Sequence, residues 1–99
     1  MAYALKRVIE IYNEIRIEEK PKEIVLNLKE FNTIDMLIRK RILIYTISKV
    51  LGNSQNIEMI NIEDVIKMCN KNIGNKYLMP NKNIKILINK GKIFLKAQN

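Results

Sequence analysis

The residue types that most often carry acid–base and metal chemistry are scarce in this chain. Histidine is absent, so the side chain that most often serves as general acid or base, metal ligand and near-neutral pH switch is missing. The adjacent acids at 18–19 and 63–64 diverge or lie at a helix start, and no sequence spacing supports acid–base work by a pair such as Glu14 and Glu30. The carboxylates therefore predict neither a catalytic pair nor a metal site.

The candidate nucleophiles also lack the context that activates them. Ser48 and Ser54 are not in a nucleophile-elbow sequence, and Cys69 has no histidine, arginine or second cysteine near it in sequence. A small core residue is the expected role of Cys69. The three glycines are isolated and form no phosphate-binding loop: Gly52, Gly74 and Gly91. We expect a protein without catalytic residues or cofactors, that is, not an enzyme.

Charge is the one uneven feature of the sequence. In residues 1–64, ten Lys and Arg balance ten Asp and Glu, whereas residues 65–99 hold eight Lys and no acid, which accounts for the whole net charge of +8. An AT-rich genome supplies lysine but does not deplete glutamate, so codon bias does not explain this distribution. Two aromatic residues, Tyr77 and Phe94, lie among these lysines. This pattern favours a polyanion-binding surface, whose candidate residues are Lys76, Lys82, Lys85, Lys90, Lys92 and Lys96.

The same lysines have a second interpretation. They can be the solvated faces of a helix and two strands, balanced across the fold by the acids of the first helix and of residues 18–23. All eight cations are lysine, and lysine lacks the planar fork with which arginine reads guanine. If DNA binds here, it binds with little sequence preference.

The chain is organised around an apolar helix at residues 32–52. Asn32 is its expected N-cap, Asp35 its capping-box acid and Gly52 its left-handed C-terminal residue. Apolar residues surround most of this helix, so other elements must cover it on several sides. The basic run at 39–41 gives no second patch, because consecutive helical side chains point about 100° apart.

The other elements follow from hydrophobic periodicity. Residues 2–17 predict an amphipathic helix, 18–22 a charged turn, and 23–29 a half-buried strand that runs directly into the central helix. A loop at 53–56, a short strand at 57–60 and a helix from Asn61 to about Asn70, stopped by Gly74, are expected next.

The last quarter has two interpretations. In the favoured one, residues 83–88 and 92–96 form a hairpin around a turn that contains Gly91. In the other, residues 81–90 form a helix after Pro80, followed by one strand.

Together the elements predict one domain, residues 1–99, of α+β class. Two longer helices and one short helix pack on a small, mainly antiparallel sheet that includes the C-terminal hairpin. A winged-helix-like fold is the alternative, although Pro80 leaves no clean basic recognition helix. The longest apolar run, Ile42 to Tyr45, is too short for a membrane span, no secretory signal precedes it, and the cysteine is single. We expect a protein inside the cell, with no membrane partner.

The opening sequence MAYALKRVIEIYNEIRIEE, the length and the dense use of Ile, Lys and Glu resemble small proteins of filamentous and rod-shaped viruses of hot-spring archaea. The thirteen Asn depart from this pattern, because thermophilic chains tend to shed amides. The resemblance implies a thermostable viral protein of unassigned function in the host cytoplasm, from a virus with a double-stranded DNA genome. It carries over no functional residue.

Two functional hypotheses remain open. The first is a non-enzymatic protein whose lysine-rich C-terminal third binds DNA or another polyanion without sequence preference. The second is a protein-interaction or oligomerisation module that contacts a viral or host protein through an apolar patch or a sheet edge. Lysines gathered on one face favour the first hypothesis, and lysines paired with the acids of residues 10–23 favour the second.

Overall fold

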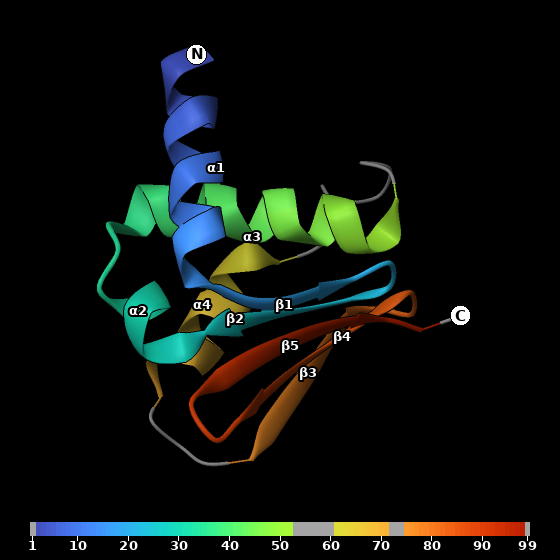
Figure 1. The fold of residues 1–99 in the computed structure, drawn as a ribbon. Helices are drawn as coiled ribbons and strands as arrows, with labels where there is room; N and C mark the ends of the chain where they lie inside the picture. Colours follow the sequence, from blue (N-terminus) through green and yellow to red (C-terminus); the bar gives the residue numbers. More distant parts are fainter. Residues whose placement is uncertain (1, 53–60, 72–74, 99) are drawn as a thin grey trace.

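Helices form one layer and a five-stranded sheet forms the other in the computed structural model, which describes residues 2–52, 61–71 and 75–98 (Figure 1). The elements in chain order are α1 (Ala2–Ile15), β1 (Arg16–Lys20), β2 (Glu23–Asn27), α2 (Leu28–Asn32), α3 (Met36–Leu51), α4 (Ile62–Asn70), β3 (Lys76–Asn81), β4 (Ile84–Asn89) and β5 (Lys92–Ala97). The predicted α+β class is therefore confirmed.

The sheet has the order β1-β2-β5-β4-β3, and every neighbouring pair is antiparallel. The last strand in sequence, β5, is thus the central one. Two hairpins, β1–β2 and β4–β5, meet where β2 pairs with β5, and the backbone N–H of Leu28 extends this junction by donating to the carbonyl of Gly91 at 3.0 Å. The sheet therefore pairs strands from the first third of the chain with strands from its last quarter.

The core lies between the sheet and the helices. Alternate residues of β2, β4 and β5 point into it and are at most 2% exposed: Ile24, Leu26, Ile84, Ile86, Ile88, Ile93 and Leu95. Tyr12 of α1, Ile47 of α3 and Val65 of α4 cover them from the helical side. This period of two, with one face buried, fixes the register of each strand, because a slip by one residue would expose the whole set.

The C-terminal hairpin is confirmed, and the helix over residues 81–90 is wrong. Lys90 and Gly91 form the turn with φ of 50° and 75°. Positive φ at both central residues is the geometry of the type I′ turn, whose twist matches that of the flanking strands. The winged-helix alternative is also wrong, because β3 occupies the chain after residue 75, where a recognition helix would have to lie.

Helix α3 is close to the predicted central helix but starts later. Asp35 is its N-cap and accepts a hydrogen bond from the N–H of Leu37 at 3.1 Å, while Gly52 closes it with φ of 83° as predicted. Asn32 is not the cap, because its side-chain amide donates to the carbonyl of Cys69 at 3.0 Å. A separate short helix, α2, places Phe31 in the core and interrupts the predicted passage from strand to helix.

Helix α4 forms where its start signals predict it. The side chain of Asn61 accepts a hydrogen bond from the N–H of Asp64 at 3.3 Å, and the helix ends at Asn70. The predicted loop at 53–56, the strand at 57–60 and the stop at Gly74 lie outside the described residues. Within the part of the chain that is described, none of the helices combines the length and apolarity that a membrane crossing requires.

Two strands were not predicted from the sequence. Helix α1 ends at Ile15, and the supposed charged turn is mostly β1, so only Pro21 and Lys22 make the turn. Every residue of β1 is exposed, and only one residue of β3, Leu78, is a partly buried apolar side chain packed on the core. Edge strands with so little apolar alternation carry no clear period of two.

Candidate nucleic-acid interface

One face of the sheet carries no helix among the described residues (Figure 1). Side chains alternate between the two faces of a strand, so the residues between the buried ones of β2, β4 and β5 point away from the helices. We call this surface the open face. Its composition bears on both functional hypotheses.

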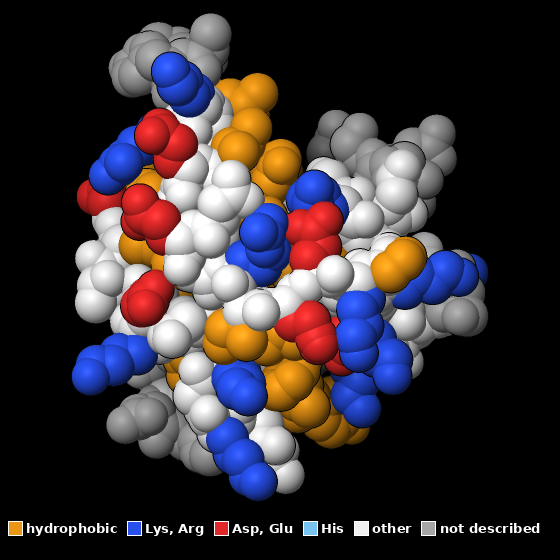
Figure 2. Space-filling view, in the orientation of Figure 1, with side chains coloured by type: hydrophobic (Ala, Val, Ile, Leu, Met, Phe, Trp, Pro, Cys, Tyr) orange, Lys and Arg blue, Asp and Glu red, His pale blue; other side chains and the backbone are white. Residues whose placement is uncertain are grey.

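An apolar row crosses the middle of the open face from β2 to β3. Val25 pairs with Phe94, Phe94 with Leu87, and Leu87 with Tyr77, so these four side chains lie side by side on neighbouring strands. Val25 is only 5% exposed, Phe94 and Leu87 are half-buried, and Tyr77 is 60% exposed. Figure 2 shows apolar side chains on this lower part of the molecule between groups of Lys and Arg. The row presents two aromatic rings to the outside.

Lysines border the row on both sides. Lys96 and Lys92 lie two residues from Phe94 in opposite directions along β5, and Lys85 lies two residues from Leu87 on β4. A rise of about 3.4 Å per residue puts each of these lysines roughly 7 Å from the row. Three of the six predicted residues thus converge on one face around the aromatic rings.

Lys85 and Lys96 are direct cross-strand partners on this face. Like charges at such a pair lie about 5 Å apart at their Cβ atoms and destabilise a sheet. The ammonium of Lys85 leans over the ring of Tyr77 instead, at 4.5 Å from the ring centroid. Two cations therefore lie side by side on this face, Lys85 against the ring of Tyr77 and Lys96 between Lys85 and Glu23.

The other predicted lysines lie around the rim. Lys82 is in the β3–β4 turn, at the end of the sheet near Lys85 and Lys96, while Lys90 is in the β4–β5 turn at the opposite end. Lys76 pairs with the inward-facing Ile88, so it points toward the helical side at the sheet edge. The structure therefore brings together Lys82, Lys85 and Lys96, keeps Lys92 and Lys90 at the far margin, and excludes Lys76.

Acids reach only one side of the open face. Glu18 pairs with Val25 on the β1 side, and Glu23 is the cross-strand neighbour of both Lys20 and Lys96. Lys20 and Glu18 form an ion pair at 3.6 Å. Among the described residues, none of the six predicted lysines forms an ion pair with an acid, although Lys96 lies directly opposite Glu23. The positive part of the face accordingly lies over β3, β4 and β5.

A second polar cluster lies on the helical side, around Glu19. Its carboxylate accepts a hydrogen bond from the hydroxyl of Tyr12 at 2.7 Å and pairs with Arg16 at 3.3 Å and Lys49 at 3.5 Å. The Tyr12 hydrogen bond and the two cations hold the pKa of Glu19 below its usual value. Burial and the same hydrogen bond raise the pKa of Tyr12.

The contacts of this cluster stabilise the fold. Tyr12 packs edge-to-face against Tyr45 with ring centroids 5.1 Å apart, and the ammonium of Lys49 lies over both rings. A carboxylate with a lowered pKa and three donors is a poor general base. The cluster ties β1 to α1 and α3.

A groove beside α1 brings together the two acids considered for acid–base work. Glu14 and Glu30 both line it, together with Arg7 and Asp35. Within the described residues, no group of three or more potential ligands is placed to hold a metal ion. Cys69 is 1% exposed, as expected for a core residue, and burial raises the pKa of its thiol to about 12. The described residues therefore offer no activated nucleophile at Cys69.

Apolar side chains are also exposed on the helical layer. Leu5 of α1 is 54% exposed, and Leu37 and Ile44 of α3 are 62% and 41% exposed. The sheet edges are less suited to a partner strand, because β1 and β3 both contain a bulge and Pro80 of β3 has no N–H to donate.

The basic run of α3 is divided between different neighbours. Arg39 donates to the side chain of Asn70 at 3.0 Å, Lys40 pairs with Glu63 at 3.2 Å, and Arg41 is exposed. Two of the three cations thus hold α4 against α3. They form no common surface for a ligand.

Searches against known families and curated proteins found no match for this chain. The candidate interface therefore stands on the geometry of the open face. Sequence reasoning found its lysines and rings but missed Val25 and Leu87, whose place in the row depends on the pairing of β2 with β5 and of β4 with β3.

Proposed function

We propose that this protein is a non-enzymatic nucleic-acid-binding protein that holds the phosphate backbone of DNA on its open face, without preference for sequence. The observation that carries the proposal is the direct opposition of Lys85 and Lys96 beside the exposed ring of Tyr77 and the half-buried ring of Phe94. Glu23 lies opposite Lys96 on its other side and the Tyr77 ring contacts Lys85, and an anion between the two ammonium groups would add a further opposite charge to this pair.

The charge distribution supports a backbone contact. Lys82, Lys85 and Lys96 lie along one margin of the apolar row, and Lys92 and Lys90 lie along the other. Lysine binds phosphate as a flexible point charge and gives little base discrimination. Five such contacts predict that the logarithm of the binding constant for duplex DNA falls with log salt at a slope of about −4.5.

The test is a titration of two labelled duplexes of unrelated sequence, followed by fluorescence anisotropy at about 50 mM salt, where counterion release favours binding most. We expect binding to both duplexes with affinities within a few-fold of each other. The absence of binding to duplex and single-stranded DNA at this salt concentration would retire the proposal.

The archaeal viral resemblance leads to a proposal about context. A protein of a virus with a double-stranded DNA genome would meet viral and host DNA in the host cytoplasm. Thermal unfolding gives an independent test, since a protein from such a host should remain folded well above the usual mesophile range of about 45–65 °C. An unfolding midpoint inside that range would count against the viral assignment. The proposal of DNA binding does not depend on this measurement.

A second candidate function is self-association through the helical layer. It is favoured by the exposed apolar side chains Leu5, Leu37 and Ile44. The measurement is sedimentation equilibrium of the wild type and of Leu37→Lys. A monomer at high concentration in the wild type would eliminate this candidate, and a dimer lost in the variant would support it.

A further inference from the structure

We propose that the nucleic acid held on the open face is a single strand. Its unpaired bases stack on Phe94 and Tyr77, and its phosphates follow the margin formed by Lys82, Lys85 and Lys96. This inference rests on the proposed function and specifies its ligand. It is drawn from the apolar row, which a phosphate-binding surface by itself does not require.

The first argument is that an exposed ring, Tyr77, and a half-buried ring, Phe94, lie among cations. A duplex presents phosphates and sugars to a flat surface, while its base faces are stacked inside. Contact with a duplex would therefore press the apolar row of the open face against a charged backbone. Unpaired bases expose flat π-faces that stack on aromatic side chains whatever the base. The row matches a single strand better than a duplex.

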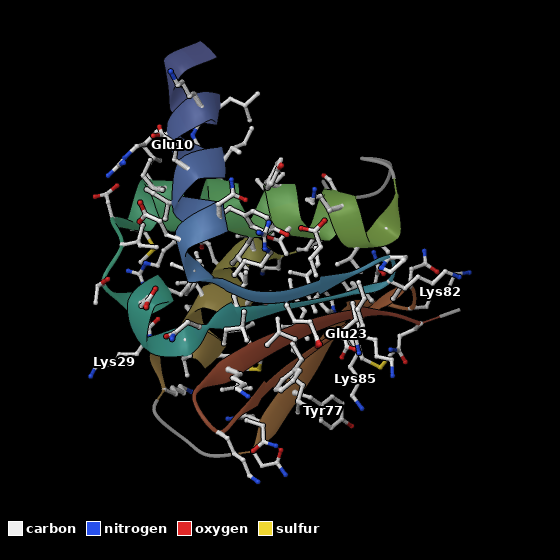
Figure 3. All side chains as sticks on the ribbon, viewed as in Figure 1. Glu10, Glu23, Lys29, Tyr77, Lys82 and Lys85 are labelled. Carbon is white, nitrogen blue, oxygen red and sulfur yellow. The ribbon has the colours of Figure 1, made fainter. Side chains whose placement is uncertain are left out.

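The second argument is geometry. Phe94 and Tyr77 lie two strands apart, which at about 4.8 Å per strand separates their backbones by roughly 10 Å across the face. Lys85 and Lys96 border this span at roughly 7 Å, and Lys82 continues the same margin at the end of the sheet. Figure 3 shows Lys85 beside Tyr77, with Lys82 farther toward the same end. A strand laid across β3, β4 and β5 would place its bases on the row and its phosphates at this margin.

The third argument concerns Lys85. Its ammonium lies 4.5 Å from the Tyr77 ring centroid, so it covers part of the ring in the free protein. A base arriving on Tyr77 would compete for the ring face, and the flexible ammonium would turn to a phosphate. This movement exchanges a contact with Tyr77 for an ion pair and places an anion beside Lys96, its cross-strand neighbour. The bound phosphate then lies beside both lysines, on the side of Lys96 away from Glu23.

The experiment compares an oligothymidine of about 12 nucleotides with a duplex of similar charge, using Tyr77→Leu and Phe94→Leu. Both changes keep an apolar side chain and all lysines but remove a π-face. We expect the wild type to bind the single strand more tightly than the duplex, and each variant to lose about tenfold in single-strand affinity. The salt slope and duplex binding should stay unchanged.

Met36→Ala is the matched control, because Met36 is an exposed apolar side chain, 42% exposed, that lies on α3 in the helical layer. Tyr77 is on an exposed edge strand, so its variant tests the inference even if Phe94→Leu lowers stability. Equal or tighter binding of the duplex, with no effect of Tyr77→Leu on the single strand, would overturn this inference and leave the proposed function standing. Binding of neither ligand by the wild type would overturn the proposed function itself.

Discussion

Neutralising the three lysines of the open face should remove most of the salt dependence of DNA binding. The variant is Lys85→Gln, Lys92→Gln and Lys96→Gln together, which keeps the length and polarity of each side chain. Each phosphate contact contributes about −0.9 to the slope on duplex DNA. If five lysines contact phosphates in the wild type, the slope should change from about −4.5 to about −1.8.

The change is large enough to measure without extrapolation. Between 50 and 200 mM salt, a slope of about −4.5 weakens binding by roughly 500-fold, and a slope of about −1.8 by roughly 12-fold. Fluorescence anisotropy titrations at four or five salt concentrations in this range give both slopes. A single strand should show the same order with smaller slopes, since each contact then contributes about −0.7.

The control must lose the same charge from the helical layer. Lys6, Arg41 and Lys67 are exposed there, and neutralising all three also takes the net charge from +8 to +5. Arg39 and Lys40 are unsuitable, because they hold α4 against α3. We expect the control to retain a slope near −4.5. A control that lowers the slope as much as the open-face variant would refute the reasoning, since binding would then follow net charge alone.

The free energy of unfolding of the same triple variant shows whether these lysines bind a ligand or support the fold. Lys85 and Lys96 are opposed like charges, but Lys96 also lies opposite Glu23 and Lys85 contacts the Tyr77 ring, so these effects offset each other and replacing the lysines should change the free energy of unfolding by only about a few tenths of a kcal/mol. Chemical denaturation of the triple variant measures this. A clear loss of stability would mean that the lysines support the fold in a way that their cross-strand placement does not explain.

Four further predictions test the rest of the structure. Glu19→Gln should lower stability by about a few tenths of a kcal/mol at neutral pH, because its carboxylate is 37% exposed and water screens its ion pairs, and by less in acid; the folded pKa of Glu19 is lowered, so its contribution is present above the usual value of 4.5 and is lost as the pH falls through the folded value. Between about pH 5 and 8 the melting temperature should be nearly flat, because the chain has no histidine, and a steep change there would contradict this. Cys69 should resist thiol reagents at pH 8 until the protein is unfolded, since it is buried and its pKa is raised to about 12; rapid labelling of the folded protein would refute its core placement. Lys90→Asn should stabilise the protein by about 1 kcal/mol in chemical denaturation, because Lys90 adopts a positive φ that asparagine tolerates better, and a loss of stability would count against the turn geometry.

Local sequence was sufficient for the C-terminal hairpin, for α4 and for the end of α3, whereas the capping signal at Asn32 misplaced the start of α3. The hairpin of β4 and β5 has alternating isoleucines and a glycine turn, and α4 has its Asn61 cap, so both form where the sequence predicts them. The same signals placed Gly52 at the end of α3. These features depend on residues within a few positions of each other, and nearby residues interact in the same way in most tertiary contexts.

Tertiary structure alone decided the edges of the sheet and the make-up of the candidate interface. Strands β1 and β3 carry little buried apolar surface and form because a neighbouring strand offers hydrogen bonds. Likewise, the sequence showed a lysine-rich segment, but only the pairing of β4 with β5 set Lys85 against Lys96, and only the pairing of β2 with β5 put Val25 beside Phe94. The alternation of side chains along a strand fixes which face of the sheet each side chain occupies. Which side chains become neighbours on that face is decided by strand order and register, and these depend on how residues far apart in sequence bury the common core.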